Sequence, residues 1–239
     1  MGGFHWRPPA ERRKFLFVEW VYFKFFTPTV DGILVYGTSG SFAGAMMLQI
    51  FPSAGSPIGD RPIRMVRHDY DAADTYFSTT NHDAFVDVNT LVEQPTGYHI
   101  IGAVRQGPSI VEWDLDFTRR YPQQHGFFGP FGDLWFDYLG WDLLCPLAKV
   151  DGTLKVNGVP VTIDGAGYTD TNFGRWLFTI DTTTHWNWVM SFDPADLDAP
   201  CVIGMNVRPK PELGRLFLMD DGTTVERFDT DASTFDHYQ

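Results

Sequence analysis

Three hydrogen-bonding side chains recur at alternate positions in the segment GAGYTDTNFGRW, residues 165–176. In an extended chain Tyr168, Asp170 and Asn172 project to the same side, because alternate residues of a β-strand point to opposite faces. A hydroxyl, a carboxyl and an amide on one face can form a polar site. The alternative is a tight turn, since Asp and Asn beside glycines are common in turns.

A candidate acid lies in the apolar segment FLFVEWVYFKFF, residues 15–26. On one face of this segment Glu19 is the only charged residue, whereas Trp20 and Tyr22 lie on the other face. If the Glu19 face lines the interior of a barrel, burial disfavours the charged carboxylate and raises its pKa, which leaves a neutral acid able to donate a proton. The alternative is a structural role, in which Glu19 pairs with an arginine or accepts hydrogen bonds from the backbone.

Two indoles alternate in the sequence His185-Trp186-Asn187-Trp188, so Trp186 and Trp188 share a face if this segment is a strand. Aromatic faces stabilise developing positive charge through the ring quadrupole. The same pair can also be ordinary hydrophobic core, and the spacing does not decide between the two interpretations.

The elements that must position these groups are predicted to be β-strands. The clearest is VEWDLDF, residues 111–117, in which apolar and acidic residues alternate. Further strands are expected at 15–26, 31–37, 44–51, 83–88, 97–105, 147–150, 153–157, 159–163, 175–181, 185–192, 201–208, 214–219 and 223–228. Asp-Gly and Asn-Gly pairs between several of these segments tolerate the positive φ angles of tight hairpins. Short strands at this spacing predict an all-β sandwich or barrel.

One stretch interrupts the pattern of short strands. Residues 119–141 are rich in glycine, proline and aromatic side chains and are too long for a hairpin. Long loops in small domains are commonly functional, so this segment is either a lid over a site or a short helix that plugs one end of a barrel.

Composition narrows the classes of partner and location. The formal net charge is −12 and the sequence pI is about 4.8, and an acidic surface repels nucleic acid phosphate. The apolar run at 15–26 is shorter than the roughly 20 residues of a membrane span. The first residues lack the apolar core of a signal peptide, so we expect a cytoplasmic protein without an integral membrane segment.

We expect neither a metal nor a cofactor. The seven histidines do not occur at metal-ligand spacings, and Cys145 and Cys201 are too few for a disulfide framework or a zinc site. The Gly165-Ala166-Gly167 run is not continued by the third glycine of a dinucleotide-binding motif.

Two motifs carry a resemblance to a known family. The segment VEWVYF, residues 18–23, resembles the E-W-W-Y-F segment of the carotenoid 1,2-hydratase family. The segment GYTDTNFG, residues 167–174, followed by Trp186-x-Trp188, is similar to that family's G-Y-x-D-x-N-x-G and W-x-W motifs. The same lipocalin-like superfamily includes fungal enzymes that close rings in polyenes by intramolecular Diels–Alder reactions. The resemblance covers residues 15–190.

The resemblance implies a lipocalin-like barrel, no cofactor and a long hydrophobic polyene or isoprenoid substrate, with Asp170 as the catalytic acid beside Tyr168. The chain departs from the family in two ways. An H-x-W motif before a proline is replaced by Asp142-x-Leu144 with Trp141 adjacent, which argues against water activation of the hydratase kind. The residues after Trp188 are also too few for a second lipocalin-like domain.

From these observations we predict a single all-β domain over residues 1–239, a lipocalin-like antiparallel barrel whose interior binds an apolar small molecule, with 191–239 as closing strands and tail. The expected activity is cofactor-independent cyclisation of a polyene or terpenoid intermediate. A hydratase that adds water to an isoprenoid double bond and a non-catalytic lipid or pigment carrier are the alternatives. An enzyme requires a buried acid of raised pKa, whereas a carrier requires none.

The candidate catalytic residues are Asp170, Tyr168, Glu19 and Asp142. The candidate substrate-binding residues are Trp20, Tyr22, Trp141, Asn172, Trp186 and Trp188.

Overall fold

Antiparallel strands account for nearly all of the regular structure in the computed structural model, which describes residues 5–14, 16–64, 67–125, 138–175, 185–208, 214–220 and 224–230. The strands are β1 Phe17–Phe26, β2 Val30–Ser39, β3 Gly44–Pro52, β4 Ile63–Arg64, β5 His68–Tyr70, β6 Thr75–Phe77, β7 Ala84–Val86, β8 Asn89–Gln94, β9 Gly97–Gln106, β10 Ser109–Arg119, β11 Gln124–His125, β12 Tyr138–Val156, β13 Val159–Arg175, β14 His185–Ser191, β15 Cys201–Arg208, β16 Gly214–Asp220 and β17 Thr224–Thr230. The helical elements are α1 Pro9–Arg12 and a 3₁₀ turn at Ala72–Asp74. No helix in these ranges is long and apolar enough to cross a membrane.

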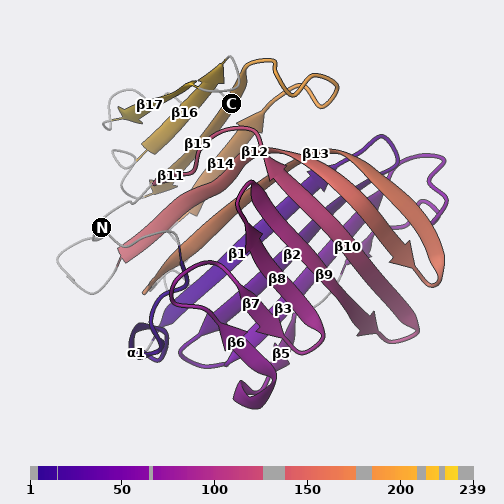
Figure 1. Ribbon diagram of the computed structural model, residues 1–239, viewed down its shortest axis with the longest axis horizontal. Coiled ribbons are helices and arrows are strands. Elements are labelled where there is room, and N and C mark those ends of the chain that lie inside the picture. The colour runs from indigo at the N-terminus through magenta and orange to yellow at the C-terminus, as the bar shows by residue number, and fades with distance from the viewer. Residues whose placement is uncertain are drawn as a thin grey trace.

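The larger sheet has 13 strands and curls into a nearly closed barrel (Figure 1). Its order is β4-β3-β2-β1-β13-β12-β10-β9-β8-β7-β6, with β5 paired to β3 and β11 paired to β12. All strand pairs are antiparallel, and β1 joins the first meander to the long β13. The prediction of an all-β, lipocalin-like antiparallel barrel is confirmed.

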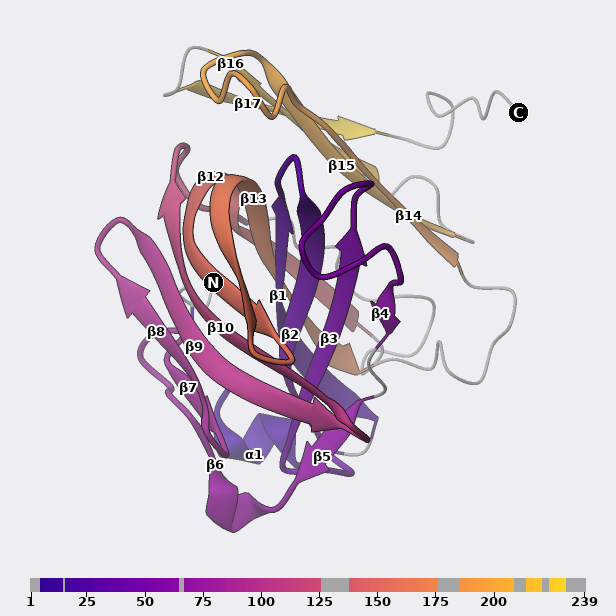
Figure 2. The same cartoon turned by 90° about the vertical axis from the view of Figure 1, so that its right-hand side faces the viewer.

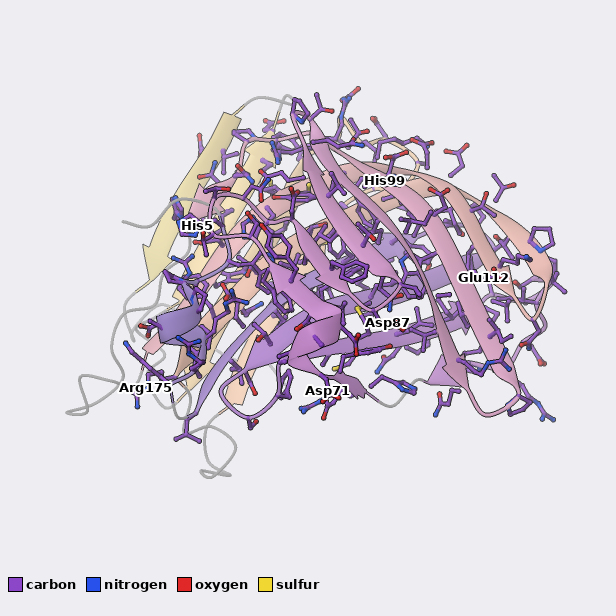
Figure 3. The ribbon with its side chains drawn as sticks, turned by 60° about the horizontal axis from the view of Figure 1, so that its bottom comes forward. His5, Asp71, Asp87, His99, Glu112 and Arg175 are labelled. Atoms are coloured by element: carbon purple, nitrogen blue, oxygen red, sulfur yellow. The ribbon has the colours of Figure 1, made fainter. Side chains whose placement is uncertain are left out.

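Strand β10 shows how alternation sorts side chains between the two faces of the barrel wall. Its apolar residues, Val111, Trp113, Leu115 and Phe117, are buried in the core inside the barrel. The acidic residues between them face outward, where Asp114 and Asp116 pair with His99 of β9. Figure 3 labels Glu112 and His99 on this outer surface. The period of two predicted for this strand is therefore confirmed.

The barrel interior in the described residues is packed with aromatic side chains. Phe23 lies edge-on to Tyr36, Tyr98 and Phe117, with ring centroids 6.1, 6.0 and 5.1 Å away. The N-terminal segment adds Trp6, which is fully buried in the same core and donates a hydrogen bond from Nε1 to the carbonyl oxygen of His82 at 3.0 Å. Trp6 thus closes one part of the interior.

Strands β12 and β13 are longer than the sequence predicted, because segments expected as separate strands are continuous. The register between them shifts near Cys145, where β12 bulges. Residues 165–175 are part of β13 and not a tight turn. Gly165 allows β13 and β1 to approach closely, because a Cβ at this position would lie 2.1 Å from the carbonyl oxygen of Phe26 on β1. The glycines beside Asp170 therefore belong to sheet packing.

The second sheet has the order β14-β15-β16-β17 and lies beside β12 and β13 (Figures 1 and 2). Its inner face packs on the outer face of the barrel wall and forms a second hydrophobic cluster. That cluster contains Tyr121, Trp141, Leu143, Leu147 and Tyr168 of the barrel sheet region together with Cys201, Ile203, Met205, Phe217 and Met219. Strands β15, β16 and β17 thus pair within this second sheet. That the whole chain forms a single domain stays a prediction.

The lid or short helix predicted within 119–141 falls largely on residues 126–137, which lie outside the described residues.

Candidate functional site

The Asp170 carboxylate accepts hydrogen bonds from three neutral side chains. Tyr168 Oη and Trp141 Nε1 donate to Oδ2 at 2.6 and 2.9 Å, and Asn172 Nδ2 donates to Oδ1 at 3.1 Å. Trp188 Nε1 of the second sheet donates to Tyr168 Oη at 3.3 Å. Both Asp170 and Tyr168 are buried, so the four partners form one connected polar network in an apolar setting.

Cross-strand register gathers these residues from distant parts of the sequence. Asp170 on β13 lies opposite Tyr22 on β1. Asn172 lies opposite Trp20 on β1 and opposite Trp141 on β12, so an indole flanks it on each side. Directly opposed residues on one sheet face have Cβ atoms about 5 Å apart, close enough for their side chains to touch. The common face of Tyr168, Asp170 and Asn172 predicted from their spacing is the outer face of the barrel wall.

Burial sets the protonation of this network. Removal from water raises the pKa of Asp170 to about 6, although the hydrogen bonds from Tyr168, Trp141 and Asn172 favour the carboxylate and act in the opposite direction. The charge of Asp142 on the other face of the wall adds to the increase. Burial and the neighbouring Asp170 raise the pKa of Tyr168 well above its ordinary value, so this hydroxyl stays protonated. Asp170 is therefore a group that exchanges its proton near neutral pH.

A pocket of about 190 Å³ opens beside Asp170, between the barrel wall and the second sheet. It is lined by Trp20, Tyr22, Asp170, Asn172, Trp188 and Met205. The structure thus brings together five of the candidate site residues, and Trp141 reaches the same carboxylate from β12. We expected the ligand inside the barrel, but this pocket lies on the outer side of the wall. The side chain of Trp186 lies outside the described part of the structure.

Glu19 and Asp142 form a separate cluster on the inner side of the wall. The backbone N–H of Arg7 donates to both carboxylate oxygens of Glu19 at 3.1 and 3.0 Å. The Arg7 guanidinium lies 3.6 Å from Glu19 Oε1 and 3.7 Å from Asp142 Oδ2, and it stacks 3.8 Å above the centroid of the Phe173 ring. His125 Nδ1 is 3.0 Å from Asp142 Oδ1.

Burial raises the pKa of Glu19 to about 8, and this effect exceeds the opposing effect of Arg7. Both interpretations offered for Glu19 therefore describe part of its environment: it is a buried acid of raised pKa, and it also pairs with an arginine and the backbone. The structure does not place Glu19 and Asp142 with Asp170. Neither Arg7 nor His125 was predictable from the sequence as part of a site, because Arg7 precedes Pro8 in a tail without periodicity and His125 lies in the aromatic-rich stretch.

Cys145 and Cys201 are buried free thiols, on the inner and outer sides of the wall respectively. Across the described ranges, no group of three or more His, Cys, Asp or Glu side chains is arranged to bind a metal ion.

Comparison with known proteins bears on the fold. The sequence matches no protein-family model, and no curated protein matches it. Its structure is similar to that of a proposed AttH from Nitrosomonas europaea, with 16% sequence identity and a TM-score of 0.62 over 89% of this chain and 68% of that one. It is also similar to CghA, crystallised alone and with Sch210972, with 10% identity and a TM-score of 0.51. The matches to CghA cover 92–93% of this chain and 65% of CghA. The chain therefore has the fold of these proteins and spans about two thirds of their length.

Proposed function

We propose that this protein is a cofactor-independent cyclase that closes a ring in an apolar polyene or terpenoid, with Asp170 as the acid. The observation that carries the proposal is a buried carboxyl of pKa about 6, held by three neutral donors, at the wall of an aromatic pocket. A carrier has no need of a hydrogen-bonded carboxyl in its ligand pocket. Such a group is a liability for stability unless it contributes to chemistry.

The proposed reaction is a proton-neutral isomerisation. Protonated Asp170 transfers its proton to one carbon of an alkene, and the remaining electron-deficient carbon is attacked by a second double bond of the same molecule, which forms the ring bond. Loss of a proton from the adjacent carbon to the Asp170 carboxylate restores a double bond and the acid. For a substrate with a conjugated carbonyl, Asp170 donates a hydrogen bond to the carbonyl oxygen. This activates the conjugated double bond for addition to a diene without complete proton transfer.

The neighbours of Asp170 have separate tasks in this proposal. Hydrogen bonds from Tyr168, Trp141 and Asn172 stabilise the carboxylate that remains after proton transfer. The rings of Trp20 and Trp188 face the pocket, where a carbocation is stabilised by an aromatic quadrupole. A pocket that holds a flexible chain in its folded, reactive shape also lowers the entropic part of the barrier.

The similar structures support a ligand-binding use of this fold, since CghA was crystallised with Sch210972. A hydratase remains the second candidate because of the likeness to a proposed AttH and to the hydratase motifs. The two activities differ in their products: cyclisation leaves the mass of the substrate unchanged, whereas hydration adds the mass of one water.

The test is the substitution Asp170→Asn, assayed by mass spectrometry and NMR on a series of linear polyenes. This substitution preserves the network, because the new amide oxygen takes the place of Oδ2 and Asn172 accepts from the new NH₂ after its amide rotates. Removal of the acid should lower turnover by about 10²–10⁴-fold. Asp164→Asn is the matched control, on the same strand and same face but 72% exposed at the side chain, and should leave turnover within about twofold.

A lowered thermal midpoint with unchanged turnover would instead make Asp170 a structural residue. Recovery of unaltered polyene from the wild-type protein across the series would favour the carrier.

A further inference from the structure

A second pocket, of about 370 Å³, adjoins the Asp170 pocket on the outer face of β1, β2 and β3. Trp20 and Tyr22 line both pockets, so the two are neighbours across a single strand. The Asp170 pocket lies on the β13 side of these aromatic side chains, and the second pocket lies on the β2 and β3 side.

Strand register aligns the two pockets in rows across the sheet. One row runs from Asp170 through Tyr22 and Val35 to Met47. Neighbouring strands are about 4.8 Å apart, so the three steps of this row span about 14 Å.

The parallel row runs from Asn172 through Trp20 to Gly37 and Ala45. Its two small residues on β2 and β3 leave space above the sheet, next to the larger side chains of the first row. The register therefore places the two pockets side by side on the outer face, with Trp20 and Tyr22 between them and Asp170 beyond.

Volume indicates that the two pockets act together. Pockets for organic ligands generally measure about 300–1,000 Å³. At about 190 Å³ the Asp170 pocket is below this range, so it has room for the reacting segment of a substrate and not for a whole natural product. The adjoining pocket supplies the missing volume.

We propose that the pocket on β1–β3 binds the unreactive apolar tail of an elongated substrate, whose reacting end passes over Trp20 and Tyr22 to reach Asp170. This proposal rests on the proposed function and assigns the substrate class more narrowly: a linear molecule with one reactive end and a long, uncharged hydrocarbon end.

The lining of the tail pocket agrees with an uncharged occupant. Its lining includes the apolar side chains of Ile33, Val35, Phe42 and Met47. Arg67 is the one cationic side chain among the lining residues that the structure describes. Its guanidinium lies 3.9 Å from the centroid of the Phe42 ring and donates from Nη2 to Asp69 at 2.8 Å, so its charge is already compensated. A carboxylate tail would therefore gain little from Arg67.

The experiment measures binding of parinaric acid, a fluorescent linear polyene, and its displacement by saturated fatty acids of increasing length. With the wild-type protein, the affinity of the competing fatty acid should increase about two- to fourfold per added methylene until the tail pocket is full. Met47→Trp fills that pocket and should weaken parinaric acid binding at least tenfold and remove the dependence on chain length. Ile101→Trp is the matched control, since Ile101 is also a half-exposed apolar residue on an outer sheet face, 43% exposed against 37% for Met47, and it should bind like the wild type.

Gly37→Val is an independent second variant. A Cβ at Gly37 would meet only ordinary contacts, 3.5 Å from the Glu19 carbonyl oxygen and 3.6 Å from Trp20 Cβ, so a side chain is tolerated there. Gly37→Val should weaken the binding of long fatty acids at least fivefold and leave the binding of the shortest ones unchanged.

If both variants bind every chain length as the wild type does, the tail site is wrong, while the role of Asp170 is still tested separately by turnover. If the wild-type protein binds no polyene and no fatty acid, both the tail site and the proposed substrate class are wrong.

Discussion

Two buried carboxyl groups lie on opposite faces of the same barrel wall and differ in their neighbours. Asp170 faces outward, accepts hydrogen bonds from three uncharged side chains among the residues described and borders a pocket. Glu19 faces inward, is paired with Arg7 and accepts two hydrogen bonds from its backbone. Burial raises the pKa of both, to about 6 for Asp170 and about 8 for Glu19.

The comparison teaches that a raised pKa does not by itself identify a catalytic acid. Asp170 titrates close to neutral pH beside space for a ligand, whereas Glu19 fastens the N-terminal segment to β1. We therefore interpret the outer face as chemical and the inner face as structural, and four predictions test this division.

The largest expected effect is on the inner face. Trp6→Ala removes a fully buried indole from the barrel core and should destabilise the protein by about 3–5 kcal/mol, the usual result for a large aromatic residue. Turnover per folded molecule should be unchanged. Chemical denaturation and an active-site titration measure the two quantities, and Trp188→Ala, which removes a half-buried indole of the outer pocket, should show a smaller loss of stability and a larger loss of turnover.

Glu19→Ala should also act on stability and not on turnover. It leaves the partly buried N–H of Arg7 without its acceptor, at an expected loss of about 1–3 kcal/mol in the free energy of unfolding. The exposed acid variant Asp114→Ala should stay within about 0.5 kcal/mol of the wild type. A Glu19→Ala protein of normal stability and lost turnover would move the proposed acid to the inner face and break the comparison.

Tyr168→Phe sharpens the description of the outer face. Loss of the 2.6 Å hydrogen bond destabilises the Asp170 carboxylate, so the pKa of Asp170 should rise. Because a general acid must be protonated, turnover falls as pH rises through that pKa, and the midpoint of the fall should move upward by roughly one pH unit. Tyr36→Phe, which removes a hydroxyl bonded to the Thr90 carbonyl inside the barrel, should leave the midpoint in place.

The pH dependence of stability distinguishes the two acids. Because the pKa of Glu19 is about 8 in the folded protein and ordinarily 4.5, the folded state retains a proton that the unfolded state releases. The contribution of this group to stability is therefore present below pH 4.5 and is lost as pH rises toward 8. In Glu19→Gln the thermal midpoint should fall less between these limits, whereas Asp170→Asn should flatten the curve only between pH 3.8 and about 6. Identical curves for the two variants would contradict the assigned pKa values.

Alternation along the strands made the grouping of Tyr168, Asp170 and Asn172 predictable, but not the side of the wall on which they lie. The shared face of Tyr168, Asp170 and Asn172 followed from a spacing of two, and so did the opposite orientations of Glu19 and Trp20. Period-two patterning does not say which face points into the barrel when both faces of a strand are buried, as they are in this part of β13. The burial of Asp170 on the outer face depends on the second sheet, whose packing against the wall does not follow from the alternation pattern.

The alternation rule also separates Asp142 from Asp170, although both were predicted as catalytic residues. Trp141 and Asp142 are adjacent in β12, so their side chains point to opposite faces, and only Trp141 reaches Asp170. The partners of the inner acids were not predictable, because Arg7 reaches Glu19 from a tail without regular strand pattern and His125 reaches Asp142 through the short strand β11.

The pairing of β1 with β13 has a consequence for biosynthesis. The hydroxyl of Thr171 donates to the Trp20 carbonyl oxygen, a contact between residues 151 positions apart in the chain. During translation β1 is followed at once by its partner β2, whereas its other partner, β13, emerges much later, so one edge of β1 stays unpaired in the meantime. Closing so long a loop is entropically costly and slows folding. The half-site on β1, with Trp20 and Tyr22, is thus completed only after β13 has emerged, and until then its apolar side chains are open to chaperones and to aggregation.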